Sequence, residues 1–164
     1  MGLTITAYKK ARLIDVPAPN LPKVVIETGN SNCLQGDNLE ADQIYHFEES
    51  LSISLTYNDF CALRNKLARI AGYPAAKTKR SGSEHSISAW QAWDGGDKNG
   101  TLAALINFED SESEIGNATC RKTLADLKAV ANDGCELNTE NKAQVATLIE
   151  LFTMAADGGF VKFH

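Results

Sequence analysis

The N-terminal part of the chain alternates apolar and polar residues with the period of a β-strand. Residues 3–8 place leucine, isoleucine and alanine on one side and polar or amphipathic residues on the other, so a strand there would bury one face. Residues 11–16 continue this pattern and are expected either to extend that strand or to pair with it. A further short strand is predicted at 23–27, after prolines that interrupt regular structure.

Turn-forming residues separate these strands from the next β pattern. Residues 28–42 are polar and rich in glycine, asparagine, serine and aspartate, so the sequence predicts a loop there. Strands are then expected at 43–47 and 51–55. The polar break Glu48-Glu49-Ser50 between them predicts a hairpin.

Helical periodicity first appears at 57–71. Thr56, followed three residues later by Asp59, has the pattern of a capping box, and Gly72-Tyr73-Pro74 marks the end of the helix. One apolar stripe is expected to face the core, with the basic residues mostly off it. The stripe is Phe60, Leu63, Leu67 and Ile70, and the basic residues are Arg64, Lys66 and Arg69.

Two more helices are expected near the C-terminus. The first spans 117–132, with Asn117 as its cap, and the second spans 139–156 and ends at Gly158-Gly159. A terminal strand is predicted over 160–163. The expected buried residues are Leu124, Leu127, Val130 and Ala131 in the first helix and Val145, Leu148, Ile149, Phe152 and Ala155 in the second.

Residues 75–101 have no convincing period, which is typical of a binding or mobile loop. The run that follows, 102–108, is apolar and short, and we expect it to be a buried strand.

Composition adds limits to this picture. The 164 residues correspond to one ordinary domain, and no apolar run is long enough for a transmembrane helix. The four cysteines lack metal-site or disulfide-framework spacing, and no secretory signal precedes them, so reduced thiols in a cytoplasm are expected. The formal charge of −5 argues against nonspecific nucleic-acid binding, which needs a basic surface.

Four stretches, in order along nearly the whole chain, carry a resemblance to known proteins. They are Met1 to Tyr8; Tyr57, Arg64, Leu67, Ala68, Ala71, Gly72 and Tyr73; Ile106, Asn107, Phe108, Asp110, Glu112, Ile115 and Gly116; and Ala155 to Phe163. With these motifs the chain resembles a group of small proteins known mainly from bacteriophages and prophages, to which no activity is assigned. It departs from their pattern at Thr4, Leu55, Thr56 and Leu63.

The acidic segment 109–114 is the sharpest polar feature. Its carboxylates suit a divalent cation, but the spacing is not that of an EF-hand. The favoured interpretation is a solvated loop in which Asp110 and Glu112 lie before the following helix and accept hydrogen bonds from its first backbone amides. No metal site is therefore expected.

A second candidate site combines basic and aromatic residues on the irregular segment 75–101. Such a mixture suits either a nucleotide or a protein partner, because tryptophan and arginine dominate interface hot spots. The alternative is a surface loop whose tryptophans fold back onto the core. The residues are Lys77, Lys79, Arg80, Trp90 and Trp93.

These patterns together predict one α+β domain over 1–164, in which a small, mainly antiparallel sheet packs against about three helices. The leading functional interpretation is a phage- or prophage-associated accessory protein that recognises a host or phage macromolecule, in the first place a protein. The alternative is an enzyme or ligand-binding protein that acts on a nucleotide-like molecule through Tyr57, Asp110 and Glu112. No catalytic signature and no cofactor motif is present, so the enzyme is the less favoured interpretation.

Overall fold

The structure is a computed structural model. It describes residues 2–16, 19–26, 34–35, 39–74, 100–106, 113–133 and 137–164. Eight strands and four helices lie in this part of the chain. In chain order they are β1 Gly2–Lys9, β2 Arg12–Leu13, β3 Lys23–Val25, β4 Leu34–Gln35, β5 Ile44–His46, β6 Glu49–Thr56, α1 Tyr57–Ile70, α2 Ala103–Ile106, β7 Ser113–Ile115, α3 Asn117–Asp133, α4 Thr139–Ala156 and β8 Phe160–Phe163.

The main sheet has five strands in the order β4-β7-β8-β1-β6. β1 pairs antiparallel with β6 along its whole length, from Gly2 opposite Thr56 to Lys9 opposite Glu49. The C-terminal strand β8 lies between β1 and β7, which confirms the terminal strand that the alternation at 160–163 predicts. All pairs in this sheet are antiparallel except β4 with β7.

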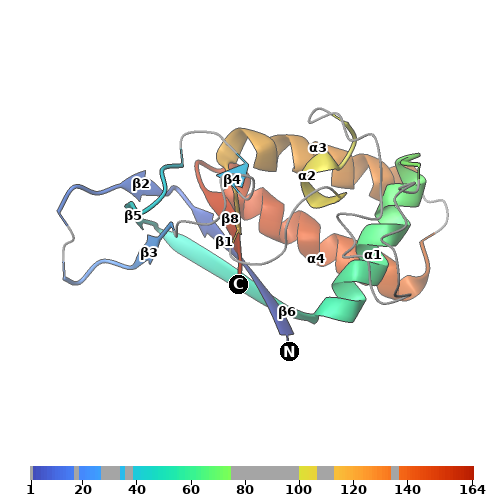
Figure 1. The fold of residues 1–164 in the computed structure, drawn as a ribbon, viewed down its shortest axis with the longest axis horizontal. Helices are drawn as coiled ribbons and strands as arrows, with labels where there is room; N and C mark the ends of the chain where they lie inside the picture. The colour runs from blue at the N-terminus through green and yellow to red at the C-terminus, as the bar shows by residue number, and fades with distance from the viewer. Residues whose placement is uncertain are drawn as a thin grey trace, which may run out of the picture.

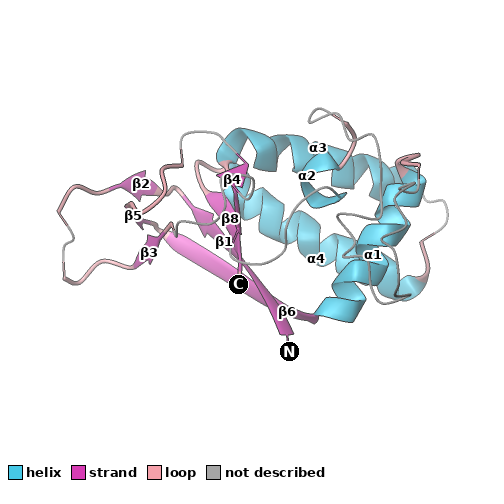
Figure 2. Cartoon of the chain, viewed as in Figure 1, coloured by secondary structure: helices cyan, strands magenta, loops and turns pink. Residues whose placement is uncertain are grey.

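The helices cover one face of this sheet (Figures 1 and 2). α4 packs on β1, β6 and β8, α3 packs on α4, and α2 lies between α1 and α3. Alternate residues of the central strands point into this layer and are fully buried. They include Leu3, Ile5 and Ala7 of β1 and Val161 and Phe163 of β8.

The small sheet β2-β5-β3 lies at the end of β1 and β6 that is far from the N-terminus (Figure 1), and its side chains contact those of β1 and β8. A second, smaller core fills the space between the two sheets. Its centre is aromatic: the ring centroids of Tyr8 and Phe160 are 4.9 Å apart, and those of Tyr45 and Phe160 are 5.9 Å apart. The fold is therefore α+β, as the sequence predicts, with the β structure divided between two sheets.

The helix ends follow the local sequence closely. The Oγ1 atom of Thr56 accepts a hydrogen bond from the backbone N–H of Asp59 at 3.0 Å, which confirms the expected cap of α1. Asn138 caps α4 in the same way, through a bond of 2.8 Å from the N–H of Asn141. No helix in the described part of the chain is both long enough and apolar enough to cross a membrane.

The hairpin expected at 43–55 is wrong. β5 pairs with β2 and β3 in the small sheet, whereas β6 pairs with β1 in the main sheet. The chain changes sheets at Glu48, whose N–H donates to the carbonyl of Lys9. The reason is that the two strands face different cores: Tyr45 contributes to the aromatic core, while Leu51 packs beside the main one.

Three other expectations about strands also need correction. β2 neither extends β1 nor pairs with it, because Lys10 has a φ of 49° and turns the chain toward β5. β4 lies within the expected loop 28–42. The apolar run at 102–108 contains the short helix α2 instead of a strand, although its described residues are buried as expected. A continuous apolar run has no period that distinguishes a strand from a helix.

The helices differ from expectation at several positions, and Ile70, Leu124 and Ile149, which the sequence places in the core, are only half-buried. Arg64 lies in the core at 1% exposure, with its guanidinium carbon 4.6 Å from the centroid of the Phe60 ring. Asn117 donates its side-chain amide to the carbonyl of Ala155 at 2.9 Å and so joins α3 to α4. Ala131 of α3 is exposed. Leu151 of α4 is buried, because α4 is covered by both α3 and the sheet.

Candidate functional site

Of the residues singled out in the sequence, Tyr57 is the one that the structure describes. It is the first residue of α1 and lies half-buried against the main core. The other candidates lie outside the described residues, so the expected meeting of Tyr57 with the acidic segment stays a prediction. They are Lys77, Lys79, Arg80, Trp90, Trp93, Asp110 and Glu112.

The end of the acidic segment differs from the solvated loop that we expected. Ser113 and Glu114 belong to β7 and are buried, at 0% and 1% exposure. Glu114 lies opposite Lys162 of β8, and the Nζ atom of Lys162 is 3.6 Å from its Oε1 atom. This carboxylate is therefore part of the interior.

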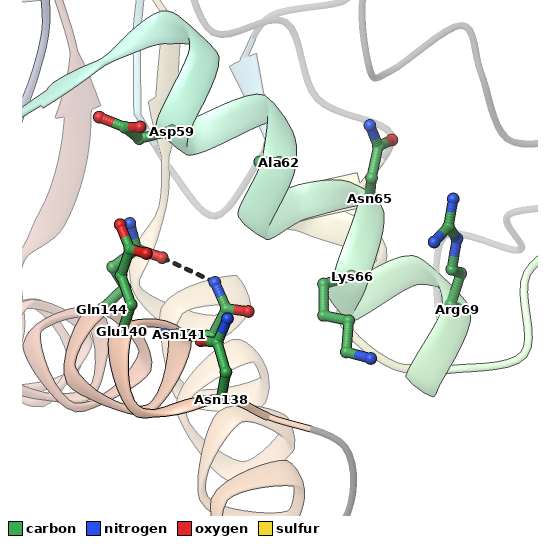
Figure 3. A pocket seen from close by; sticks show the side chains of 9 residues that line it. All are labelled: Asp59, Ala62, Asn65, Lys66, Arg69, Asn138, Glu140, Asn141 and Gln144. Carbon is green, nitrogen blue, oxygen red and sulfur yellow. Dashed lines mark hydrogen bonds between the residues drawn. The ribbon is translucent and has the colours of Figure 1, made fainter.

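A polar groove lies between α1 and the start of α4 (Figure 3). Its volume is about 340 Å³. Its α1 wall is Asp59, Ala62, Asn65, Lys66 and Arg69, and its α4 wall is Asn138, Glu140, Asn141 and Gln144.

The groove follows from the helical period of α1. Phe60, Leu63 and Leu67 turn into the core, whereas the residues at 59, 62, 66 and 69, which are three or four positions apart, lie along one flank of the helix. This flank carries small or polar side chains. The opposite wall is fixed by the cap of α4, where Asn141 also donates its side-chain amide to the Oε1 atom of Gln144 at 3.1 Å.

Charge is ordered along the groove. Asp59 and Glu140 lie toward one end, and Lys66 and Arg69 lie toward the other (Figure 3). Asp59 is held in place by the Oγ1 hydroxyl of Thr56, which donates to its carboxylate at 2.6 Å. The side-chain amides of Asn138, Asn141 and Gln144 lie beside these charges. Each amide both donates and accepts hydrogen bonds, as a polypeptide backbone does.

The lining is made mainly of charged and amide side chains. It contains no histidine, cysteine, serine or tyrosine, so the groups in the described walls that could act as a nucleophile or a base are the amine of Lys66 and two carboxylates. Among the described residues no group of three or more histidine, cysteine, aspartate or glutamate side chains could hold a metal ion. What these walls can supply is hydrogen bonds and ion pairs.

Two features of the sequence relate to this groove. The spacing predicts Asp59 as part of the cap of α1, which it is, and it places Lys66 and Arg69 off the apolar stripe, which agrees with their positions on the flank. What no local pattern shows is that α4 lies opposite, because α1 and α4 are far apart in the chain. The sequence feature that indicates a shared helix flank is the helical spacing of residues 59, 62, 66 and 69.

A second polar group lies between the two sheets and is missed by the sequence pattern. Lys162 donates to the carbonyl of Val25 in β3 at 3.0 Å, so its ammonium links the main sheet to the small one. On the neighbouring strand, Thr6 shares a hydrogen bond of 2.9 Å with the hydroxyl of Ser52. Burial raises the pKa of the Tyr8 phenol, the hydrogen bond with Thr6 lowers it, and the charge of Glu114 raises it further.

Comparison with known proteins adds no relative: no protein-family model, no curated protein and no solved structure matches this chain.

Proposed function

We propose that this protein is a binding protein, and that the groove between α1 and α4 holds a segment of a partner polypeptide. The observation that carries the proposal is the order of the lining: carboxylates at one end, cations at the other and amides beside them. A small apolar ligand would find few apolar walls here, whereas a polypeptide offers backbone amides and side chains of both charges.

The arrangement also sets the direction of the partner segment. An acidic side chain of the partner pairs with Lys66 or Arg69, and a basic one pairs with Glu140 or Asp59. A segment in the reverse direction would place like charges together. The groove therefore selects partners by charge order as well as by composition.

The resemblance of the sequence to phage and prophage proteins supports a narrower form of the proposal. In that form the protein is an accessory factor in the cytoplasm of a bacterial host, and its partner is a host or phage protein. The small-molecule alternative rests on Tyr57 together with Asp110 and Glu112, and no geometry in the described residues favours it.

Differential capture tests the groove. The bait is the full chain, alongside the groove variant Lys66→Glu/Arg69→Glu and the control variant Arg12→Glu/Lys128→Glu. The control makes the same change in charge at two exposed positions outside the groove. All three should have similar melting temperatures before they are exposed to host lysate.

A protein captured by the wild type and by the control, and reduced at least about tenfold with the groove variant, is the expected result. Its purified form should bind less tightly as salt rises, because exposed ion pairs are screened. Equal capture by all three baits, or capture of no specific protein, would contradict the proposal.

A further inference from the structure

Strand β6 forms an exposed edge of the main sheet. It is last in the order β4-β7-β8-β1-β6, and its pairing with β1 runs over eight residues from Glu49 to Thr56 without a bulge. No strand of the described part of the chain pairs with its outer side. Figure 1 shows β6 as one long strand along the border of the molecule.

The backbone groups that face outward can be identified from the register. Thr4 exchanges two backbone hydrogen bonds with His164, on the β8 side of β1. Since alternate residues of a strand point to opposite neighbours, Leu3, Ile5 and Ala7 bond toward β6. Their partners are Leu55, Ile53 and Leu51. The backbone N–H and C=O groups of Ser50, Ser52 and Ser54 therefore face away from the sheet.

This edge lacks the features by which proteins usually prevent edge pairing. Edge strands are commonly shielded by charged side chains, proline, a bulge or very short length. Residues 50–56 contain no charge and no proline, and the strand is long and regular. The side chains of Ser50, Ser52 and Ser54 are exposed, and none of them obstructs a neighbouring strand.

The sequence of the edge is nearly symmetric about Ile53. It reads Ser50-Leu51-Ser52-Ile53-Ser54-Leu55-Thr56, with a hydroxyl residue matching a hydroxyl residue and leucine matching leucine on either side. An antiparallel pair of identical strands related by a two-fold axis at Ile53 would therefore place like against like. We propose that β6 pairs in this way with β6 of a second copy of the chain, which makes one sheet continuous across a dimer.

The two-fold pairing satisfies both faces of the sheet. Ile53 meets its counterpart and Leu51 meets Leu55 on the face that carries the helices, which extends the half-buried apolar row already packed beside the main core. On the other face Ser52 meets Ser54. The outward backbone groups of Ser52 and Ser54 bond to each other across the axis.

Charge fixes the register. Glu49 is the charged residue of the strand, and it lies opposite Tyr57 of the second copy, so no like charges are directly opposed. Its carboxylate already accepts a bond of 2.9 Å from Lys9. The alternative two-fold centre at Ser52 would place Leu55 against Glu49 and is less favourable. A strand from a different protein would not require this internal symmetry, and so a second copy is the occupant that the pattern specifies.

The oligomeric state of the full chain tests the proposal. Light scattering and sedimentation over a concentration series should show a mass that approaches twice 17.7 kDa. Ser54→Pro removes one outward N–H without breaking a bond to β1, and it should weaken association at least about tenfold. Ser54→Ala keeps that N–H and should leave the dimer unchanged. Ser54→Lys places a charge on the edge and should weaken the dimer as Ser54→Pro does.

Circular dichroism identifies any variant that fails to fold, and if Ser54→Pro fails, Ser54→Lys decides the result. A wild-type protein that stays monomeric at every concentration would overturn the proposal. The same holds if the monomer binds an extended peptide at this edge instead of a second copy. A dimer that persists unchanged in both Ser54→Pro and Ser54→Lys would overturn it as well.

Discussion

Lys162 and Glu114 face each other across the β8–β7 pair, with Nζ 3.6 Å from Oε1, and their side chains are 5% and 1% exposed. Two charges removed from water in this way are costly unless each has compensating partners. The ammonium of Lys162 also donates to the carbonyl of Val25. The pair therefore joins three strands of two sheets. The stability of the packing between the two sheets thus depends on this ion pair as well as on the aromatic contacts.

Replacing Lys162 with methionine tests this dependence. The substitution keeps the length of the side chain and removes the cation opposite Glu114, so the free energy of unfolding should fall by about 3–5 kcal/mol. Urea denaturation measures it. Adding Glu114→Gln to Lys162→Met should recover part of the loss, because the buried negative charge is then gone. A single variant within about 1 kcal/mol of the wild type would contradict the structural role of the pair.

Tyr8 predicts how stability depends on alkaline pH. Its pKa is raised above the ordinary value of 10.0, chiefly by burial, so the phenol loses its proton in the unfolded chain at a lower pH than in the fold. The stability that the protonated phenol contributes is fully present below the pKa of Tyr8 in the unfolded chain. It is lost as pH rises through the higher pKa of Tyr8 in the folded protein. Denaturation from about pH 8 to about pH 11 should show a steeper fall for the wild type than for Tyr8→Phe. Parallel curves would exclude this account.

Phe152 tests the main core. It is fully buried on α4, so truncation to alanine should lower the free energy of unfolding by about 3–5 kcal/mol. Its neighbour Thr153 is exposed, and Thr153→Ala should stay within about 0.5 kcal/mol of the wild type. A denaturation midpoint that Phe152→Ala leaves unchanged would rule out the packing of α4 on the sheet.

Gly159 is required where the chain leaves α4 for β8. A Cβ atom at this position would lie 1.7 Å from the carbonyl oxygen of Tyr8, so the backbone of β1 would have to move. Gly159→Ala should therefore cost at least about 3 kcal/mol in chemical denaturation. Gly72 is the comparison: it has a φ of 79° but open space around it, and Gly72→Ala should cost about 1–2 kcal/mol. Equal losses would show that β1 does not approach Gly159 closely.

Short-range patterns predict the helices of this protein well. The bounds of α4 agree with the range 139–156, and the cap of α1 forms between Thr56 and Asp59 as the spacing indicates. These features depend on residues within one or two helical turns. The alternation of residues at 160–163 likewise predicts the C-terminal strand, although no local sequence pattern shows that this strand lies between β1 and β7.

Long-range choices are not predictable from the same patterns. β5 and β6 are neighbours in the chain but belong to different sheets, because the apolar residues of β5 pack in the smaller aromatic core and those of β6 pack beside the main core. The burial of Arg64 over Phe60 cannot be read from a hydrophobic stripe, which treats every arginine as exposed. The groove is a similar case, since its two walls come from helices separated by about half the chain.

The amide side chains of the groove allow its role to be tested directly. Once a partner has been captured and purified, its addition to labelled protein can be followed through the side-chain NH₂ signals of Asn65, Asn138, Asn141 and Gln144, with exposed Asn132 on α3 as the control. The account predicts that the four groove signals shift on titration while that of Asn132 stays in place. Signals from the groove that stay in place while residues elsewhere respond would contradict it.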